Sequence, residues 1–335
     1  MSRDYVPKTR EFRKQPINHI KYSVILMRNG MNNIPRPILK WAGGKGSLIT
    51  VYESMALIPE TFDTYHEPFF GGGAVFFHLW KKGRIKKAII SDINWDVVNL
   101  YQVIKNDVDD LISELKYGNY PNEKDSFYNL RKEFNILKKV PLSDVNKADR
   151  VRRAALMIYL NRVCFNGLYR ENKSGEFNVP FGRYKDPRIL DEKNLLAVNK
   201  AFQVCEIKRR DFFDSMEIAT KGDFVYLDPP YMPISITSVF SDYSKEGFGI
   251  DEQKRLAEGY RRLGERGVKA LLSNSDHPEI ISLYQNIPGV KIDKVLAARA
   301  INCKGDGRQS ITELAISNYD LTAPILDRKN LSNYS

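Results

Sequence analysis

The chain of 335 residues is 42% hydrophobic and 11% aromatic, a composition that supports a folded core and is too apolar for a disordered protein. Its uncharged apolar stretch near the N-terminus, residues 23–27, is far too short for a membrane span, and three distant cysteines without a C-x-x-C pair give no disulfide framework or zinc site. The 52 Lys and Arg against 41 Asp and Glu give a net charge of +11, which favours a polyanionic partner, and the cysteine usage suits the reducing cytoplasm.

Much of the positive charge lies at the N-terminus. Residues 1–40 carry nine basic and two acidic side chains, which leaves a net charge of only +4 for the rest of the chain. Residues 1–34 mix Lys, Arg, Asn and Pro without a sustained period, and Met31 offers a second start. We therefore expect a basic N-terminal extension that is either disordered or precedes the true start of the protein.

Two stretches of the chain alternate segments with strand-like and helix-like patterns. The first runs from residue 38 to about 111, and the second from about 202 to 319. The expected strands are 64–67, 87–91, 223–227, 268–273 and 313–317, and the expected helices begin after Lys45, at Ala74 and at Asn94. This βαβ alternation predicts an α/β fold.

A different kind of sequence separates the two stretches. Residues 148–160 have the pattern of a basic helix, and residues 161–184 are rich in Gly, Asn, Arg and aromatic side chains. Residues 118–188 are therefore interpreted as an insertion into one α/β domain. The rest of the chain is expected to supply two parts of that domain and a C-terminal tail, namely 35–117, 189–320 and 321–335.

A glycine cluster follows the first expected strand and precedes a helix. In the run from Glu67 through Phe70 and Gly71 to Gly73, glycine lets backbone amides approach a ligand at a helix N-terminus. Asp92 ends the next strand, 19 residues after Gly73, where an acidic side chain can accept hydrogen bonds from ribose hydroxyls. Because the pattern is not G-x-G-x-x-G, it favours a smaller adenosyl cofactor over NAD. A tight turn without a ligand is the alternative.

The second glycine cluster, Lys-Trp41-Ala-Gly-Gly-Lys45, resembles a phosphate loop only superficially. A Walker A motif needs a glycine where this chain has Leu39, so ATP hydrolysis is not expected. Trp41 offers a face to a base or a sulfonium group, and Lys45 could meet a carboxylate. The alternative is a core tryptophan beside a solvated lysine.

The strongest motif is Tyr226-Leu-Asp228-Pro229-Pro230-Tyr231, directly after an apolar strand. It places a carboxylate at the carboxyl edge of the sheet, where ligands of α/β proteins bind. Asp228 and the Pro229 carbonyl can each accept one N–H of an exocyclic amine, while Tyr231 can stack on the ring. Such contacts free the nitrogen lone pair for attack. A proline-stiffened turn with an aspartate cap is the alternative.

The insertion interleaves aromatic side chains with Arg and Asn, in residues 161–170 and 175–184. Arginine can read guanine through two hydrogen bonds, and aromatic side chains can wedge into a base stack. This composition indicates contact with DNA. A structural hairpin with a solvated arginine face would have the same composition.

Together these motifs resemble a Dam-type DNA adenine-N6 methyltransferase of the D12 class. The resemblance runs from about residue 38 to 319 and rests on five motifs in one order: KWAGGK, EPFFGGG, NGLYR, GEFNVPFGR and DPPY. It implies a Rossmann-like, S-adenosylmethionine-dependent methyltransferase sheet with an inserted, mainly helical target-recognition domain. It further implies a site-specific, adenine-specific DNA methyltransferase whose partner is double-stranded DNA.

The resemblance also implies the residues of the site. The implied cofactor is S-adenosyl-L-methionine, and no metal is expected because the methyl donor is already activated by its positive charge. The positions that match the cofactor motifs are Trp41, Lys45, Glu67, Phe70, Gly71, Gly73, Asp92, Asp211, Phe212 and Asp228. The positions that match the catalytic motif are Asp228, Pro229, Pro230 and Tyr231.

The implied reaction transfers a methyl group to N6 of an adenine flipped out of the duplex, within GATC. Among the implied contacts, Arg170 reads the first guanine, and Phe165 with Asn166 fills or supports the vacated stack. The positions implied to contact DNA are Phe165, Asn166, Leu168, Arg170, Pro180, Arg183, Arg299 and Arg308. A cognate restriction endonuclease, a role in gene regulation, replication or repair, and the oligomeric state all stay open.

Three other functions remain to be weighed against this one. An RNA amino-methyltransferase would share the DPPY motif, but the recognition insertion argues against it. The intact motif from Asp228 to Tyr231 likewise argues against a catalytically silent DNA-binding regulator. A nicotinamide oxidoreductase is disfavoured by the glycine pattern and by the lack of an obvious hydride-site histidine among only four histidines.

Overall fold

The computed structural model describes residues 34–41, 45–141, 143–231, 248–297 and 311–320. All the described residues belong to one compact unit. Among the helices of this described part, none is both long and apolar enough to cross a membrane.

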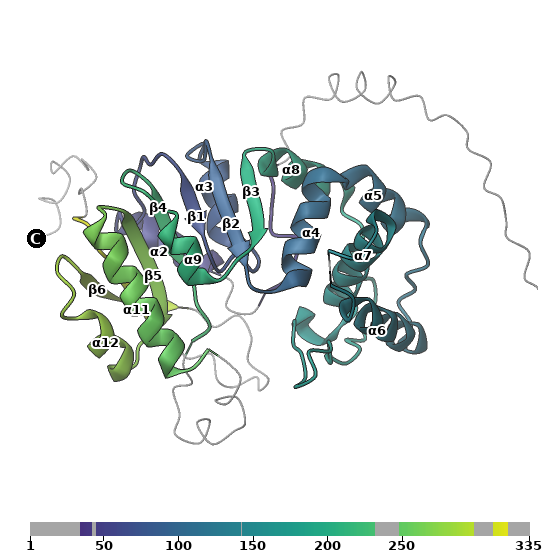
Figure 1. The fold of residues 1–335 in the computed structure, drawn as a ribbon. Helices are drawn as coiled ribbons and strands as arrows, with labels where there is room; N and C mark the ends of the chain where they lie inside the picture. The colour runs from purple at the N-terminus through teal and green to yellow at the C-terminus, as the bar shows by residue number, and fades with distance from the viewer. Residues whose placement is uncertain (1–33, 42–44, 142, 232–247, 298–310, 321–335) are drawn as a thin grey trace, which may run out of the picture. The chain divides into compact units, whose positions relative to one another are not determined.

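Within the described residues, seven strands form one sheet in the order β3-β2-β1-β4-β5-β7-β6 (Figure 1). Strands β1 to β5 pair in parallel, whereas β7 lies antiparallel between β5 and β6. The strands are β1 (Tyr65–Glu67), β2 (Ala88–Asp92), β3 (Cys205–Arg209), β4 (Phe224–Leu227), β5 (Lys269–Ser275), β6 (Lys291–Ala297) and β7 (Ile311–Ser317). The predicted α/β fold is confirmed.

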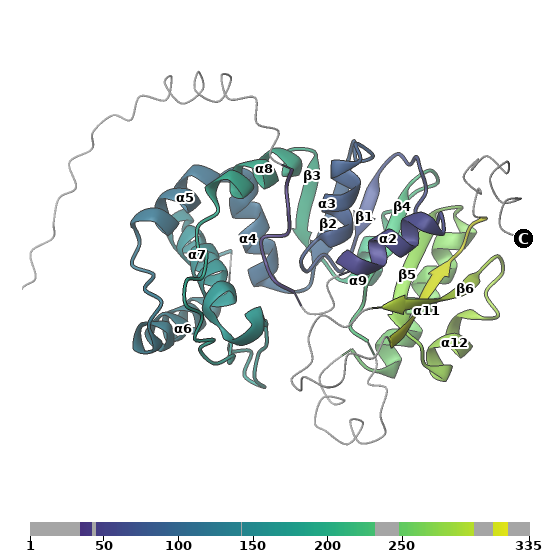
Figure 2. The ribbon, with the colours of Figure 1, turned by 180° about the vertical axis from the view of Figure 1, so that it is seen from behind.

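Helices cover both faces of this sheet (Figures 1 and 2). From β1 the chain adds β2 and β3 toward one edge of the sheet. It then returns to place β4 on the other side of β1 and adds the remaining strands toward the opposite edge. Right-handed crossovers therefore place the helices of the two halves on opposite faces. One face carries α9 (Phe212–Glu217), α11 (Ile250–Glu265) and α12 (Pro278–Tyr284), and the other carries α2 (Gly46–Ser54) and α3 (Ala74–Lys81).

Strand β4 contributes side chains to the cores on both faces. Phe224 and Tyr226 belong to the larger core, which includes α2, α3 and α4 (Trp95–Asn106), while Val225 and Leu227 belong to the core under α9, α11 and α12. Successive side chains of a strand point to opposite faces, and all four are at most 1% exposed. Burial on both sides explains the continuous apolar run. The next residue, Asp228, is the first to leave the core.

The expected strands agree with β1, β2, β4, β5 and β7 to within a few residues. Strands β3 and β6 were not among them, and they are the two edges of the sheet. Edge strands carry more polar side chains than central ones, so their apolar pattern is weaker. In β3, for example, only two of five residues, Cys205 and Ile207, are buried.

The inserted segment is mainly helical, as expected. It contains α6 (Lys124–Lys138) and α7 (Lys147–Val163), and α7 packs against α4, α6 and α5 (Val108–Tyr117). A short helical turn, η1 (Phe165–Gly167), and a hairpin follow, and α8 (Glu192–Phe202) leads back to β3. Within the hairpin, the Asn178 amide donates to the Arg170 carbonyl at 3.1 Å. These helices stand beside the β3 edge of the sheet (Figure 1).

Candidate active site

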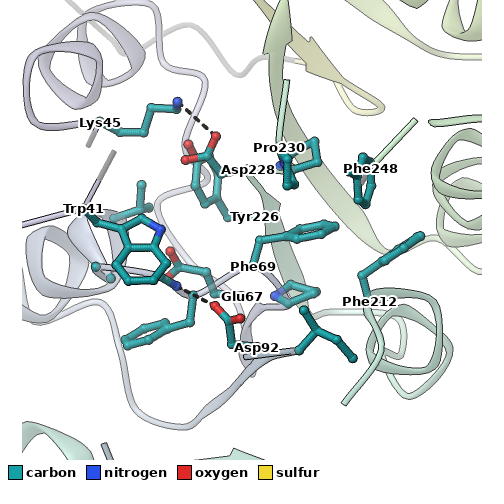
Figure 3. Close-up of a pocket in the computed structure, with 18 of the residues that line it drawn as sticks. Trp41, Lys45, Glu67, Phe69, Asp92, Phe212, Tyr226, Asp228, Pro230 and Phe248 are labelled. Atoms are coloured by element: carbon teal, nitrogen blue, oxygen red, sulfur yellow. Dashed lines mark hydrogen bonds and ion pairs between the residues drawn. The ribbon is translucent and has the colours of Figure 1, made fainter. Parts of the chain in front are cut away.

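The carboxyl ends of β1, β2 and β4 open on a cavity of about 840 Å³ (Figure 3). It lies at the point where the strand order reverses between β1 and β4, which is where ligands of open α/β sheets bind. The cavity is lined by every residue that the sequence assigned to catalysis or to the cofactor: Trp41, Lys45, Glu67, Phe70, Gly71, Gly73, Asp92, Asp211, Phe212, Asp228, Pro229, Pro230 and Tyr231. The structure thus brings together positions that span 191 residues of sequence.

Trp41 and the glycine turn form one wall of the cavity. Gly71 has a φ of 45°, and a Cβ atom there would lie only 2.6 Å from Nε1 of Trp41. Gly73, with a φ of 67°, caps the start of α3, and a Cβ atom there would lie 2.4 Å from the Phe70 ring. Both positions therefore require glycine, because of the backbone angle and because of the close neighbour.

Two buried carboxyl groups lie behind this wall. Asp92 accepts hydrogen bonds from the amides of Gly71 and Asn94, each at 2.9 Å, so it fixes the turn. Burial raises the pKa of Asp92 above its ordinary value, against the effect of these backbone donors. Glu67 accepts from the Tyr65 hydroxyl at 2.8 Å, and burial raises its pKa well above the usual range. Their remaining lone pairs can accept hydrogen bonds from a ligand.

Lys45 is an almost fully buried cation beside Asp228. Its Nζ atom lies 2.9 Å from Oδ1 of Asp228 and 3.6 Å from Oε2 of Glu313. Burial raises the pKa of Asp228 to about 6, the nearby Glu313 adds to this rise, and Lys45 opposes it. Two carboxyl groups thus share one ammonium group. When both are ionised, the cluster has a net negative charge that suits a cationic ligand.

Tyr231 is held by residues that the sequence analysis did not single out. Its hydroxyl donates to Oε2 of Glu313 at 2.7 Å and lies 2.7 Å from Oγ of Ser273, and the Tyr52 hydroxyl donates to the same Ser273 oxygen at 3.0 Å. The Lys45 ammonium lies 4.5 Å from the centroid of the Tyr231 ring. The expected stacking of Tyr231 on a base stays a prediction.

The opposite side of the cavity is aromatic. Phe69 and Phe212 stack with centroids 5.3 Å apart, and the Phe248 ring meets Phe69 edge-on at 5.6 Å (Figure 3). Asp211 caps α9 and pairs with Arg255, whose guanidinium group covers Phe212 at 4.8 Å. Phe69 and Phe248 were not predicted. Phe69 lies inside the EPFFGGG motif and could have been included, whereas nothing local marks Phe248.

The expected DNA-binding residues that the structure describes lie on η1 and the hairpin after it: Phe165, Asn166, Leu168, Arg170, Pro180 and Arg183. Phe165 is 44% exposed although it is aromatic, and its amide donates to the Pro180 carbonyl at 2.8 Å. Arg170 is exposed and donates from Nε to Oδ1 of Asn178 at 2.7 Å, so it does not pair with a neighbouring glutamate. Arg299 and Arg308 lie outside the described residues.

The site can be compared with known proteins. Residues 41–301 match the family model of the D12 class N6 adenine-specific DNA methyltransferases. The chain belongs to this family. The chain is 46% identical over 296 residues to the Type II methyltransferase M.MjaIII of Methanocaldococcus jannaschii, a match that covers 85% of this chain and 99% of the relative.

Two further relatives carry related names. The Type II methyltransferase M1.LlaDCHI of Lactococcus lactis subsp. cremoris is 38% identical over 297 residues, which cover 88% of this chain and 99% of the relative. The DNA adenine methylase of Serratia marcescens is 38% identical over 285 residues, which cover 83% of this chain and 97% of the relative. The chain is therefore an adenine-specific DNA methyltransferase, and its methyl donor is S-adenosylmethionine.

The cavity fits this methyl donor. Acidic groups at the ends of β1 and β2 match ribose hydroxyls and an ammonium group, and the aromatic side at Phe69 and Phe212 matches the adenine ring. The Asp228 carboxyl group, which lines the cavity, matches the positive sulfonium. The predicted resemblance and its cofactor are confirmed.

Proposed function

We propose that this enzyme methylates N6 of the adenine in GATC after the base has been rotated out of duplex DNA into the cavity. The observation that carries this proposal is the position of Asp228, which lies at the end of β4, faces the cavity and is held by the buried Lys45. An adenine inside the stack cannot reach a carboxylate at the bottom of such a cavity, which supports base flipping.

Asp228 and the Pro229 carbonyl are the proposed acceptors of the two N6–H bonds. Two acceptors orient the amine and leave its lone pair directed at the methyl group. When bound, S-adenosylmethionine supplies an activated methyl group on its sulfonium sulfur. The proton that the methylated nitrogen must lose can pass first to Asp228, because the pKa of this residue lies at about 6.

The other cavity residues are proposed to hold the cofactor. Asp92 would bind the ribose hydroxyls, and Phe212 with Asp211 would bind the adenine end. Glu67 and the amides of the glycine turn would bind the amino-acid end near Trp41. For Asp92 and Glu67, the role matches the hydrogen-bonding capacity that remains after their internal contacts are counted.

Residues 118–188 are proposed as the target-recognition domain, inserted between catalytic segments 35–117 and 189–320. The exposed Phe165 would fill the space that the flipped adenine vacates, supported by Asn166. Arg170 would read the first guanine, while the exposed Arg183, together with Arg299 and Arg308, would hold phosphates. Leu168 and Pro180 would contact the later bases.

Two of the relatives carry the name Type II methyltransferase, which favours a role as the modification partner of a restriction endonuclease. Such a role, like action in the cytoplasm, belongs to the proposal. An endonuclease that cuts the unmethylated form of the same sequence, and is blocked by this enzyme, would establish the pairing.

The proposal is tested by expressing the chain in a host without DNA methylation and sequencing the methylated bases. We expect N6-methyladenine within GATC. The Asp228→Ala variant should bind DNA normally but lose ~10²–10³-fold or more of the single-turnover rate, as for the loss of one key electrostatic contact. Methylation of adenine in another sequence would refute the proposed GATC specificity but not the methyltransferase reaction. An Asp228→Ala variant that keeps a tenth of the wild-type rate would refute the role of Asp228.

Sequence choice is tested at Arg170. A guanidinium that donates two hydrogen bonds to one guanine discriminates by ~1–3 kcal/mol, whereas a phosphate contact affects all sequences about equally. The measured quantity is the ratio of kcat/KM on a duplex altered only at the first guanine to kcat/KM on GATC. Arg170→Ala should increase this ratio. Arg183→Ala is the matched control and should lower both values together. An unchanged ratio in Arg170→Ala would exclude base reading by this residue.

A further inference from the structure

Tyr169 lies where the recognition hairpin meets the cofactor cavity. It directly precedes Arg170, and it lines the cavity together with Trp41. The two rings are stacked, with centroids 5.3 Å apart and planes inclined by 24°. The segment proposed to read DNA therefore supplies part of the wall of the site proposed to hold the cofactor.

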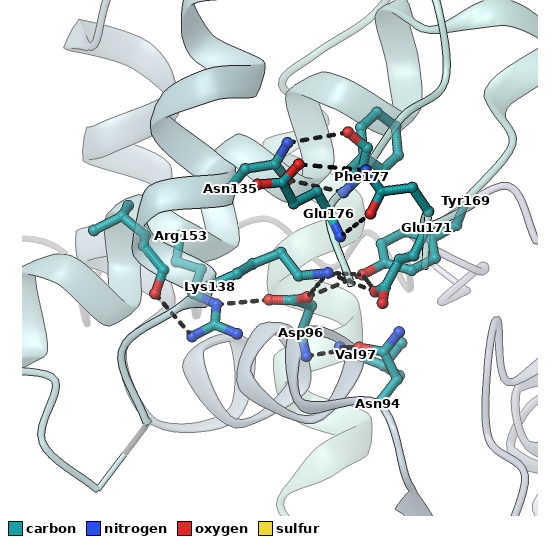
Figure 4. Close-up of polar contacts among 12 residues, drawn as sticks. Asn94, Asp96, Val97, Asn135, Lys138, Arg153, Tyr169, Glu171, Glu176 and Phe177 are labelled. Carbon is teal, nitrogen blue, oxygen red and sulfur yellow. Dashed lines mark hydrogen bonds and ion pairs between the residues drawn. The ribbon is translucent and has the colours of Figure 1, made fainter. Parts of the chain in front are cut away.

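The hydroxyl group of Tyr169 is held by charged side chains, of which Asp96 is buried and Glu171 is exposed (Figure 4). It lies 2.9 Å from Oδ2 of Asp96 and 2.5 Å from Oε1 of Glu171, and Lys138 donates to it at 3.0 Å. Lys138 also pairs with Asp96 at 3.0 Å. Asp96 accepts in addition from Nε of Arg153 at 2.6 Å.

This network joins three helices to the hairpin. Asp96 lies on α4, Lys138 on α6 and Arg153 on α7, and the side chains of Asp96 and Arg153 are only 2% and 3% exposed. Because buried charges are expensive to separate, the Tyr169 hydroxyl has one strongly preferred position. A shift of the hairpin would therefore change the contact between this ring and Trp41.

Trp41 continues the line of contacts into the cofactor site. Its indole packs over Gly71 so closely that a Cβ atom there would lie 2.6 Å away. The Gly71 amide donates to Asp92, and its carbonyl accepts from the Tyr101 hydroxyl at 2.6 Å. Packed contacts thus run from the residue beside Arg170 to the carboxylate proposed to bind ribose.

We propose that Tyr169 is a positioning residue through which recognition of DNA and binding of the cofactor strengthen each other. The Tyr169 ring fixes Trp41 over the glycine turn when the hairpin is docked on its DNA sequence, and a filled cofactor site holds the hairpin in the same position. By linkage, each ligand increases the affinity for the other by the same factor. This inference deepens the proposed function and rests on it.

The test is the dissociation constant of sinefungin, a cofactor analogue with no transferable methyl group, measured by calorimetry with and without a duplex that contains one GATC site. We expect the duplex to tighten binding to the wild-type protein by about tenfold, within the usual range of such coupling. Tyr169→Leu should reduce this enhancement to less than about twofold. Tyr169→Phe keeps the ring but loses the hydroxyl contacts that fix it, so its enhancement should lie between those of the wild type and Tyr169→Leu. Tyr169→Met is a second variant without a ring, in case the leucine variant does not fold.

The matched control is Tyr117→Leu, at the 77% exposed end of α5, which should leave the enhancement unchanged. If Tyr169→Leu weakened both ligands but kept the enhancement, the role would be merely structural and the inference would be wrong. A loss in Tyr169→Phe as large as in Tyr169→Leu, or no enhancement in the wild type, would also overturn it. Methylation of the same duplex by the wild type tests the proposed function separately.

Discussion

In the proposed mechanism Asp228 accepts a hydrogen bond from the target amine, so we expect its protonation to control the reaction. Its pKa lies at about 6 because burial outweighs the attraction of Lys45, and Glu313 raises it further. Below this pKa the carboxyl group is neutral and binds the amine less well. The rate should thus fall as the pH is lowered through about 6, a range in which an ordinary aspartate would still be ionised.

The substitution Glu313→Gln isolates the contribution of the second carboxyl group. Glutamine can still accept from the Tyr231 hydroxyl but carries no charge, so the pKa of Asp228 should fall. In a plot of single-turnover rate against pH, the fall on the acid side (the acid limb) should then move to lower pH. The maximal rate, reached near pH 8, should stay close to that of the wild type. The exposed Glu279→Gln serves as a control. An acid limb that stays in place or moves upward would contradict the assigned electrostatics.

Gly71 offers a test in which strain and steric contact can be separated. Gly71→Ala and Gly83→Ala both place a side chain at positive φ, where the cost is ~1–2 kcal/mol, but only the first would collide with a neighbour, Trp41. Both variants should lose stability in thermal unfolding, and Gly71→Ala should lose more because of the collision with Trp41. Only Gly71→Ala should also bind S-adenosylmethionine more weakly. Equal affinity in the two variants would show that the indole does not need its present position.

The sequence identified the site residues that lie within short motifs. It missed those that come from parts of the chain far from these motifs. Asp92 ends β2, Asp228 directly follows β4, and Gly71 lies in the turn after β1, so their position at the carboxyl edge could be predicted. Glu313 is 82 residues away from Tyr231 and belongs to an antiparallel strand whose pairing cannot be read from local pattern. The one available signal was a glutamate inside an otherwise apolar run.

At the scale of elements, burial decided which parts could be predicted. Central strands such as β4 are buried on both faces and appear as short apolar runs, whereas the edge strands β3 and β6 do not. Helix α7 was expected over residues 148–160, yet it is buried on most sides by α4, α5 and α6. The start was located to within one residue of Lys147, but a helix surrounded in this way lacks a clear polar face, and its end at Val163 lies three residues beyond the expected one.

The contact between α4 and α7 depends on a buried charge. Asp96 pairs with Arg153 and Lys138 in the interior, so Asp96→Asn leaves two cations with reduced compensation. We expect a loss of ~3–5 kcal/mol in the free energy of unfolding. The control Asp110→Asn breaks an exposed pair with Lys147 and should cost less than about 1 kcal/mol. Similar losses from urea unfolding of both variants would contradict the structural role of the buried network.

At the scale of the whole molecule, charge is unevenly divided between residues 1–40 and the rest of the chain. The cavity concentrates carboxyl groups, while residues 1–40 carry nine basic side chains against two acidic ones. The family match begins at residue 41, so no motif of the enzyme lies in residues 1–34. A basic segment outside the motifs can attract phosphates without reading bases.

This division predicts the effect of starting the chain at Met31. The shortened protein lacks seven basic and two acidic residues but keeps every motif, so it should methylate the same sequence. Its affinity for DNA should be lower at low salt, and the slope of log K against log salt should become shallower by about 0.9 for each lost phosphate contact. A full-length variant with the same seven basic residues changed to glutamine should give the same slope. If the glutamine variant kept the wild-type slope, the N-terminal extension would not contact phosphates. If the shortened protein lost all activity, the extension would be part of the folded enzyme.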